Sequence, residues 1–160
     1  MIPISASAQN AEHPFYFQGY GFVADESKLG LAGGVGGEGL FSNGFGLGCE
    51  YAKARNPYGE NMLSLNFFYH FGASKNKRIV EPFVTGGFTR FWVTNLDQTP
   101  AGGGNFGIGV NVWLAKHVAV RLEGRDTIGG QSVSTMYVPS GTYYTAPNNV
   151  VSFRIGVTFR

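Results

Sequence analysis

The last ten residues of the chain alternate between apolar and other side chains without interruption. Val151, Phe153, Ile155, Val157 and Phe159 are apolar, and the residues between them are polar, charged or glycine. Successive side chains of a β-strand point to opposite faces, so this segment has one wholly apolar face. Such a face must meet either a protein core or lipid, and that choice decides which kind of β protein the chain can form.

Period-two alternation between turn residues dominates the rest of the chain, and no window shows the 3.6-residue period of an amphipathic helix. We expect strands at about 14–23, 31–41, 44–54, 61–71, 79–92, 103–114 and 118–127, followed by 151–160. The first of these is aromatic on both faces, so its orientation stays open. The pattern predicts an all-β fold, an eight-stranded antiparallel up-and-down transmembrane β-barrel that forms a single domain over residues 14–160.

The composition favours a membrane barrel over a soluble enzyme. The 160 residues include 25 Gly, 14 Phe, 8 Tyr and 2 Trp, and only 14% are charged. The mean hydropathy of −0.04 suits a barrel, whose strands give only every second residue to lipid. No stretch approaches the roughly 18 apolar residues of a spanning helix. The net charge of +2 is too small to indicate nucleic-acid binding.

The predicted connections alternate in length. Those at 24–30, 55–60, 93–102 and 128–149 are mostly longer than those at 42–43, 72–78 and 115–117. An outer-membrane barrel with both termini in the periplasm has short periplasmic turns and long outer loops. Asn43-Gly44 is also a favoured tight hairpin turn. The alternation therefore predicts the orientation of the barrel as well as its class.

The polar face combines glycine, Ser, Thr and Asn with a few charges, whereas the apolar face carries more volume than eight strands can enclose. We therefore expect the apolar face, including Phe153, Ile155, Val157 and Phe159, to meet lipid and Arg154 to point into the lumen. Buried charges must be paired. We predict a Glu–Arg network that closes the lumen to ion flow and contains Glu38, Glu50, Glu81, Arg121, Glu123, Arg125 and Arg154.

Four stretches resemble a known family. The segment GGNFGIGVNVWLAKHVAVRLEGRD (103–126) and the terminal VVSFRIGVTFR look like the last strands of the bacterial OmpA-type outer-membrane β-barrel domain. GLGCEYAKA (46–54) and EPFVTGGFTRF (81–91) look like its third and fifth strands. The resemblance covers about residues 15–160 and implies an eight-stranded barrel in the outer membrane, inserted by the barrel assembly machinery. That machinery usually reads a terminal aromatic residue, whereas here Phe159 is penultimate.

The N-terminal residues resemble the end of an export signal. Ala6-Ser7-Ala8, followed by Gln9-Asn10, has the small-x-small form of a signal-peptidase site. Met1–Ile4 is too short for the charged and apolar regions of a whole signal peptide. We expect residues 1–13 to be the residual end of an export signal with a disordered N-terminus.

Signals for catalysis or cofactor binding are weak. The segments 34–39 and 102–107 match G-x-G-x-x-G, but neither precedes an expected helix, as dinucleotide binding requires. Cys49 is the only cysteine, and the three histidines lack metal spacing. His70 is expected in the lumen at the periplasmic end of its strand, whereas a barrel hydrolase needs a histidine beside a serine or carboxylate near the outer rim. We expect no catalytic residue, cofactor or metal.

These patterns predict a non-enzymatic integral outer-membrane barrel with a side-chain-plugged lumen. Its role would be structural or lie in surface contact through outer loops, of which 128–149 carries Tyr137, Tyr143 and Tyr144. The expected partners are outer-membrane lipid and the assembly machinery, and the chain is expected to be a monomer. One alternative is a soluble lipocalin-like ligand-binding barrel with apolar side chains inside. Another is an outer-membrane enzyme that acts on lipid.

Overall fold

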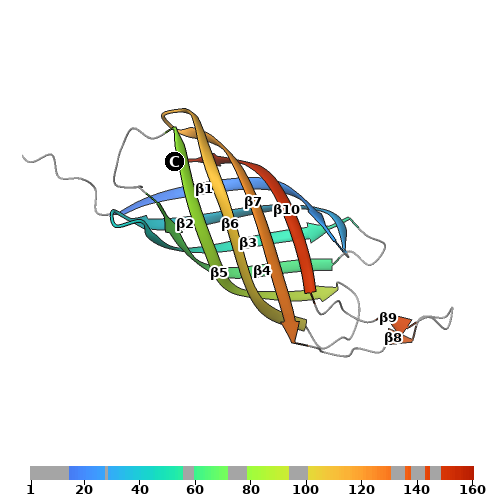
Figure 1. The fold of residues 1–160 in the computed structure, drawn as a ribbon. Helices are drawn as coiled ribbons and strands as arrows, with labels where there is room; N and C mark the ends of the chain where they lie inside the picture. The colour runs from blue at the N-terminus through green and yellow to red at the C-terminus, as the bar shows by residue number, and fades with distance from the viewer. Residues whose placement is uncertain are drawn as a thin grey trace, which may run out of the picture.

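Eight long strands form a closed antiparallel barrel (Figure 1). The computed structural model describes residues 15–27, 29–55, 60–71, 79–93, 101–130, 136–137, 143–144 and 149–160, so the predicted export signal lies outside the described residues. The barrel strands are β1 (Phe15–Glu26), β2 (Gly30–Phe41), β3 (Phe45–Ala54), β4 (Glu60–His70), β5 (Val80–Val93), β6 (Ala101–Ala115), β7 (Val118–Gly130) and β10 (Asn149–Phe159). No helix in these ranges is long and apolar enough to cross a membrane.

The barrel closes by pairing its first strand with its last. β1 pairs with β10 from Gly19 opposite Phe159 to Glu26 opposite Ser152, and every other pairing joins strands that follow one another around the wall. Each of the eight strands therefore has a neighbour on both sides, which leaves no open sheet edge. The predicted fold class, an eight-stranded up-and-down antiparallel barrel, is confirmed.

Several strands continue further than their apolar pattern predicts. β1 runs to Glu26 and β7 to Gly130, because ladder pairing continues past the end of the apolar alternation. The connection between β1 and β2 therefore shrinks to residues 27–29, whereas that between β4 and β5 covers 71–79 at the opposite rim. The predicted alternation of long and short connections is wrong for this pair. The last connection also contains a short strand pair, β8 (Met136–Tyr137) with β9 (Tyr143–Tyr144), which the sequence pattern missed.

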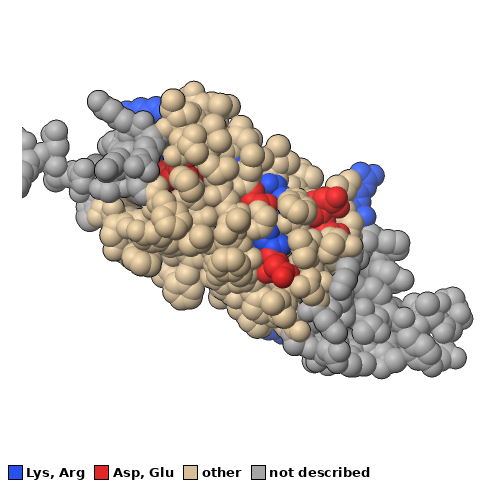
Figure 2. Space-filling model, viewed as in Figure 1, with Lys and Arg blue, Asp and Glu red and all other residues tan. Residues whose placement is uncertain are grey.

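The outward face of the wall is apolar. Phe67 is 70% exposed and Phe153 is 73% exposed, and Ile155, Val157 and Phe159 are exposed beside Phe153. Figure 2 shows one side of this wall as mostly uncharged surface, with charged atoms over β7 and β10 and at the two ends. Large contiguous apolar surfaces are rare on monomeric soluble proteins and mark contact with lipid or protein.

Aromatic and charged residues mark the two borders of this apolar band. At the rim that carries the tight turns, rings gather in pairs: Phe15–Phe41 at 5.7 Å, Phe45–Tyr69 at 4.8 Å and Tyr69–Phe71 at 4.9 Å between centroids. Toward the other rim, the first outward-facing charges on the odd-numbered strands are Asp25, Lys53, Arg90 and Asp126. Girdles of this kind flank the lipid-facing band of a membrane barrel.

The depth of an outward-facing residue in the apolar band should therefore decide how much a charged substitution lowers the free energy of unfolding. Phe67 lies in the middle of the band and Phe71 lies on the same face at its border. Phe67→Arg is expected to lower the free energy of unfolding by about 2–4 kcal/mol in phospholipid vesicles, and Phe71→Arg by about 0–1 kcal/mol. Urea titration followed by tryptophan fluorescence measures both. Equal, small effects would contradict a lipid-facing wall, because an exposed Phe in water tolerates either change.

Candidate functional site

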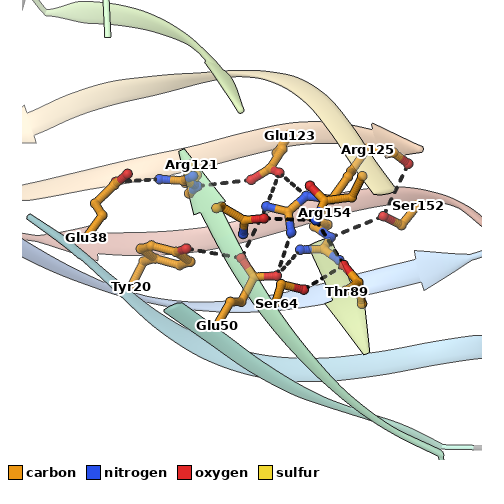
Figure 3. A network of polar contacts seen from close by, with 12 residues as sticks. Tyr20, Glu38, Glu50, Ser64, Thr89, Arg121, Glu123, Arg125, Ser152 and Arg154 are labelled. Atoms are coloured by element: carbon orange, nitrogen blue, oxygen red, sulfur yellow. Dashed lines mark hydrogen bonds and ion pairs between the residues drawn. The ribbon is translucent and has the colours of Figure 1, made fainter. Parts of the chain in front are cut away.

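The lumen is filled by alternate residues of all eight barrel strands. The structure brings every one of the predicted charges to the inner side of the wall. Arg154 is partly buried, and the other six are buried: Glu38, Glu50, Glu81, Arg121, Glu123 and Arg125. They come from β2, β3, β5, β7 and β10, so residues far apart in the chain meet at the barrel axis (Figure 3). The interior is the candidate functional site, because buried polar and charged side chains fill it instead of an ordinary apolar core.

Glu50 is the centre of the network. Arg125 donates from both Nη atoms to the two carboxylate oxygens of Glu50, at 2.9 and 3.2 Å, in a bidentate pair. Arg154 donates to the same carboxylate, and the Tyr20 hydroxyl donates to Glu50 Oε2 at 3.0 Å. Two guanidinium groups and one phenol thus surround a single buried anion (Figure 3). Charge-assisted bonds of this geometry offset much of the cost of removing the groups from water.

Arg121 extends the network toward the tight-turn rim. Its Nη1 lies 3.0 Å from Glu38 Oε1, and its Nε lies 3.3 Å from Glu123 Oε2. Glu123 also accepts from Arg125 Nε at 2.7 Å, so this carboxylate links the two arginines. The guanidinium of Arg121 is further held between rings, 4.0 Å from the Phe83 centroid and 4.2 Å from that of Tyr20. Cation–π contacts strengthen where the cation has lost its water.

His70 joins the network to a second group near that rim. Its Nδ1 lies 2.7 Å from Glu81 Oε1 and its Nε2 lies 3.3 Å from Glu38 Oε2. Carboxylates only accept, so both contacts are hydrogen bonds only when both ring nitrogens carry a proton. Glu81 also accepts from Trp113 Nε1 at 3.3 Å, and Arg160 Nη1 lies 3.8 Å away. The basic side chains nearest Glu81 are therefore His70 and Arg160, not the three arginines that the sequence singled out.

The predicted set of four glutamates and three arginines is incomplete. Glu26 and Glu60 also lie buried in the lumen, where the strands continue past their predicted ends. They are near the loop-bearing rim, which is the rim opposite the tight turns and the one from which the long connection between β7 and β10 leaves. Arg154 Nη2 lies 3.7 Å from Glu26 Oε1, so this arginine serves two carboxylates. The pattern missed both residues because they stand at strand ends, where apolar alternation no longer marks the faces.

An apolar layer covers the ionic network on the side of the loop-bearing rim. Small and medium side chains pack together inside the barrel there: Ala24, Leu29, Ala32, Ala54, Met62 and Val150. Leu29 belongs to the short connection between β1 and β2 and is almost fully buried, so this connection folds over the lumen. The lumen is thus filled by two chemically different layers, one apolar and one ion-paired.

Aromatic rings inside the barrel were the largest omission of the sequence analysis. Tyr20, Phe22, Phe68, Phe83 and Trp113 are all buried in the lumen. Glycines on the neighbouring strand make room for them. A Cβ at Gly36 would lie 2.5 Å from the Tyr20 ring, and one at Gly48 would lie 2.8 Å from the Phe68 ring. The signal that could have found them is an inward glycine opposite an aromatic residue on the paired strand.

The catalytic and cofactor signals of the sequence do not assemble into a site. Both G-x-G-x-x-G segments lie inside strands, in β2 and β6. His70 is 1% exposed and lies between two carboxylates, and its backbone N–H binds the tight turn at Gly44. Gly44 has φ +90°, which favours glycine at this hairpin. Within the described ranges, no group of three or more His, Cys, Asp or Glu side chains could hold a metal ion.

A shallow hollow of about 810 Å³ lies on the outside of the wall rather than in the lumen. Apolar side chains of β5, β6, β7 and β10 line it, and Gly124 lies within it with no side chain to fill the space. Glu123 and Arg154, which are on the lumen side of the wall, also line the hollow. Charged atoms over β7 and β10 are visible on this face in Figure 2.

These features define a small transmembrane β-barrel, and solved structures share its fold. The N-terminal β-barrel domain of Pseudomonas aeruginosa OprF matches with a TM-score of 0.68 and 15% identity over 91% of this chain and 96% of that one. Neisserial surface protein A matches with 0.63 and 16% over 91% and 96%. The outer membrane enzyme PagL matches with 0.52 and 15% over 89% and 99%.

No protein-family model and no curated protein matches the chain. The likeness to solved structures therefore establishes the fold, that of the OmpA-like small outer-membrane barrels. One of the three structures described is that of an enzyme, so the same fold carries different functions. Function has to be argued from the side chains that fill and surround the barrel.

The ion-pair network makes a strong prediction about stability. Arg125→Met leaves Glu50 and Glu123 each short of a buried cationic partner, and is expected to lower the free energy of unfolding by about 3–5 kcal/mol. Adding Glu123→Gln removes one of the two carboxylate charges that lose a partner in Arg125→Met. The double variant should therefore lose less than the sum of the two single losses, with a coupling of about 0.5–3 kcal/mol. Urea unfolding in vesicles measures this cycle, and additive losses would contradict the network.

Proposed function

We propose that the chain is a non-enzymatic integral protein of the bacterial outer membrane, with a lumen plugged by side chains. Its role is structural or lies in surface contact through the outer loops. The inverted arrangement of the barrel carries this proposal, since Phe153 and its neighbours face outward while paired Glu and Arg side chains fill the inside. Its partners are membrane lipid and, during insertion, the barrel assembly machinery, and it acts as a monomer.

The orientation follows from the connections. The rim with the tight turns at 42–44 and 116–117, where the chain also reaches Arg160, faces the periplasm. The rim from which the long connection between β7 and β10 leaves, with the pair β8–β9, faces the cell exterior (Figure 1). Short periplasmic turns and longer outer loops are the rule for outer-membrane barrels. The outer connections are then the part of the chain available to other surfaces.

The soluble lipocalin-like alternative is contradicted by the interior. A ligand-carrying soluble barrel needs apolar side chains inside and a solvated exterior. Here Glu38, Asn111 and Thr158 are fully buried in the lumen, and large apolar residues such as Phe67 and Phe106 lie outside. The arrangement is the reverse of the one that the alternative requires.

The enzyme alternative has less support than a non-enzymatic barrel with a plugged lumen. His70 is the histidine best placed for chemistry, but its described partners are carboxylates and it is buried near the tight-turn rim. A general base must reach the proton that it removes from a substrate. A substrate approaching from the outer leaflet would meet the apolar layer around Leu29 and Met62 first.

Membrane fractionation tests the proposal directly. A closed barrel with no open edge is expected to stay in the membrane pellet until detergent is added. It should then migrate faster on an SDS gel before heating than after heating, because unheated SDS does not unfold it. An unfolded or soluble chain gives one band at one position. Recovery of the protein in the soluble fraction, with no heat-dependent shift, would sink the proposal.

Planar-bilayer recording tests the plug. The folded protein is expected to give no steady openings at 100 mV, because the ion-paired layer and the apolar layer around Leu29 both block the lumen. Water is expelled from narrow apolar constrictions, so the apolar layer should block ions without any charge. Arg125→Met should therefore also stay closed. Steady, large openings from the unmodified protein would overturn the plugged lumen.

A further inference from the structure

Outward-facing charges at the outer border of the band are sorted by sign around the barrel. Lys53 on β3 and Arg90 on β5 flank β4, and both are exposed. Asp25 on β1 and Asp126 on β7 flank β10. In the closed order of strands, β4 and β10 are diametrically opposed. One side of the border is therefore basic and the opposite side acidic, although the chain's net charge is close to zero.

The strand register groups the basic side chains with two aromatic rings. Lys53, Asn61 and Trp92 stand in one row across β3, β4 and β5, and Tyr51, Leu63 and Arg90 stand in the next row. From strand spacing and rise, the Cα atoms of Lys53 and Arg90 are roughly 12 Å apart. Both side chains are long enough to reach a ligand that lies between them. Arg55, also exposed, follows Lys53 on the same strand face.

Hydrogen bonds organise the aromatic pair between these cations. The Tyr51 hydroxyl donates to Asn61 Oδ1 at 2.7 Å, and Asn61 Nδ2 donates to the Trp92 carbonyl at 3.4 Å. The Tyr51 and Trp92 ring centroids lie 6.3 Å apart, and Asn61 is buried beneath them. Two half-exposed rings thus cover a buried amide, with a cation at either end of the arrangement.

Lys53, Arg90, Tyr51 and Trp92 form a patch, and its depth in the membrane decides which ligand it can bind. Lys and Arg on the lipid face of a barrel are costly in hydrocarbon and cost little at the interface, where headgroups begin. Trp and Tyr also favour this level, since their rings are apolar and their polar atoms can reach the headgroups. Two cations on the outer side of such a patch meet anionic groups of the outer leaflet. The ligand that fits combines negative charge with a broad face that can lie on the two rings.

We propose that Lys53, Arg90 and the Tyr51–Trp92 pair bind the phosphorylated sugar headgroup of an outer-leaflet glycolipid. The cations pair with its phosphates and the rings lie against the sugar. This inference rests on the proposed function for its orientation, since the patch meets the outer leaflet only if the loop-bearing rim faces the cell exterior. It adds a specific lipid contact at the border of a band whose apolar side chains meet acyl chains.

Native mass spectrometry of the folded protein in detergent tests the site, with bisphosphorylated lipid A as the probe. Each of Lys53→Gln and Arg90→Gln is expected to raise the dissociation constant about fivefold, and the double variant about 25-fold, as one cation near an anionic lipid surface accounts for roughly that factor. Raising the salt should weaken binding by the unmodified protein more than by the double variant. Lipid A stripped of its phosphates should bind the two proteins alike.

The chain offers a matched control at the opposite rim. Lys116 is exposed in the turn between β6 and β7, and Lys116→Gln should leave lipid A binding within twofold of the unmodified protein. Equal binding by the double variant, an equal loss with Lys116→Gln, or equally effective competition by phosphatidylglycerol would overturn the site. The heat-dependent gel shift of each sample separates the two claims. An unmodified protein that does not fold in detergent refutes the proposed function, whereas folding without selective lipid A binding refutes only the site.

Discussion

A backbone that lies in hydrocarbon must satisfy all of its own hydrogen bonds, and every other feature of this barrel depends on that constraint. Water is absent there, so an open sheet edge would leave a row of unpaired amides and carbonyls. Pairing of β1 with β10 removes the last edge. Once the sheet is closed, each strand has one face toward lipid and one toward the axis. The apolar side chains then belong outside and the polar ones inside, the reverse of a soluble barrel.

The closed wall creates a second requirement, because the polar side chains are confined to a narrow lumen with little water. Ion pairs around Glu50 and Glu123 neutralise the arginines there, and His70 connects this group to Glu81. Rings packed on inward glycines fill the remaining space, and Tyr20 and Phe83 sandwich the Arg121 guanidinium. Several strands contribute to each contact, so the network ties the wall together across its axis.

Prediction from the sequence succeeded where the two faces differ chemically. On β10, Phe153 and Arg154 differ so clearly that periodicity assigns both faces. It failed where that contrast disappears. On β1, Phe17 faces outward and Tyr20 inward, although each is paired with a glycine of β2. Only the register distinguishes them, because it places Tyr20 on the face of the buried Glu38. At the outer strand ends, residues such as Glu26 stay in the ladder without any apolar alternation, so neither the strand ends nor the additional lumen carboxylates could be located.

The sequence by itself determined the class of fold, the number of barrel strands and the side of the wall to which the seven predicted charges belong, because an alternation of period two is a local property of the chain. Only the tertiary structure decided which charges meet, which rings enter the lumen and how Lys53 and Arg90 come to flank Asn61 on β4. Those facts depend on register and closure, which bring together residues that are distant in the chain. The last strand shows both: periodicity places Arg154 on the face opposite Phe153, and closure brings it to Glu50.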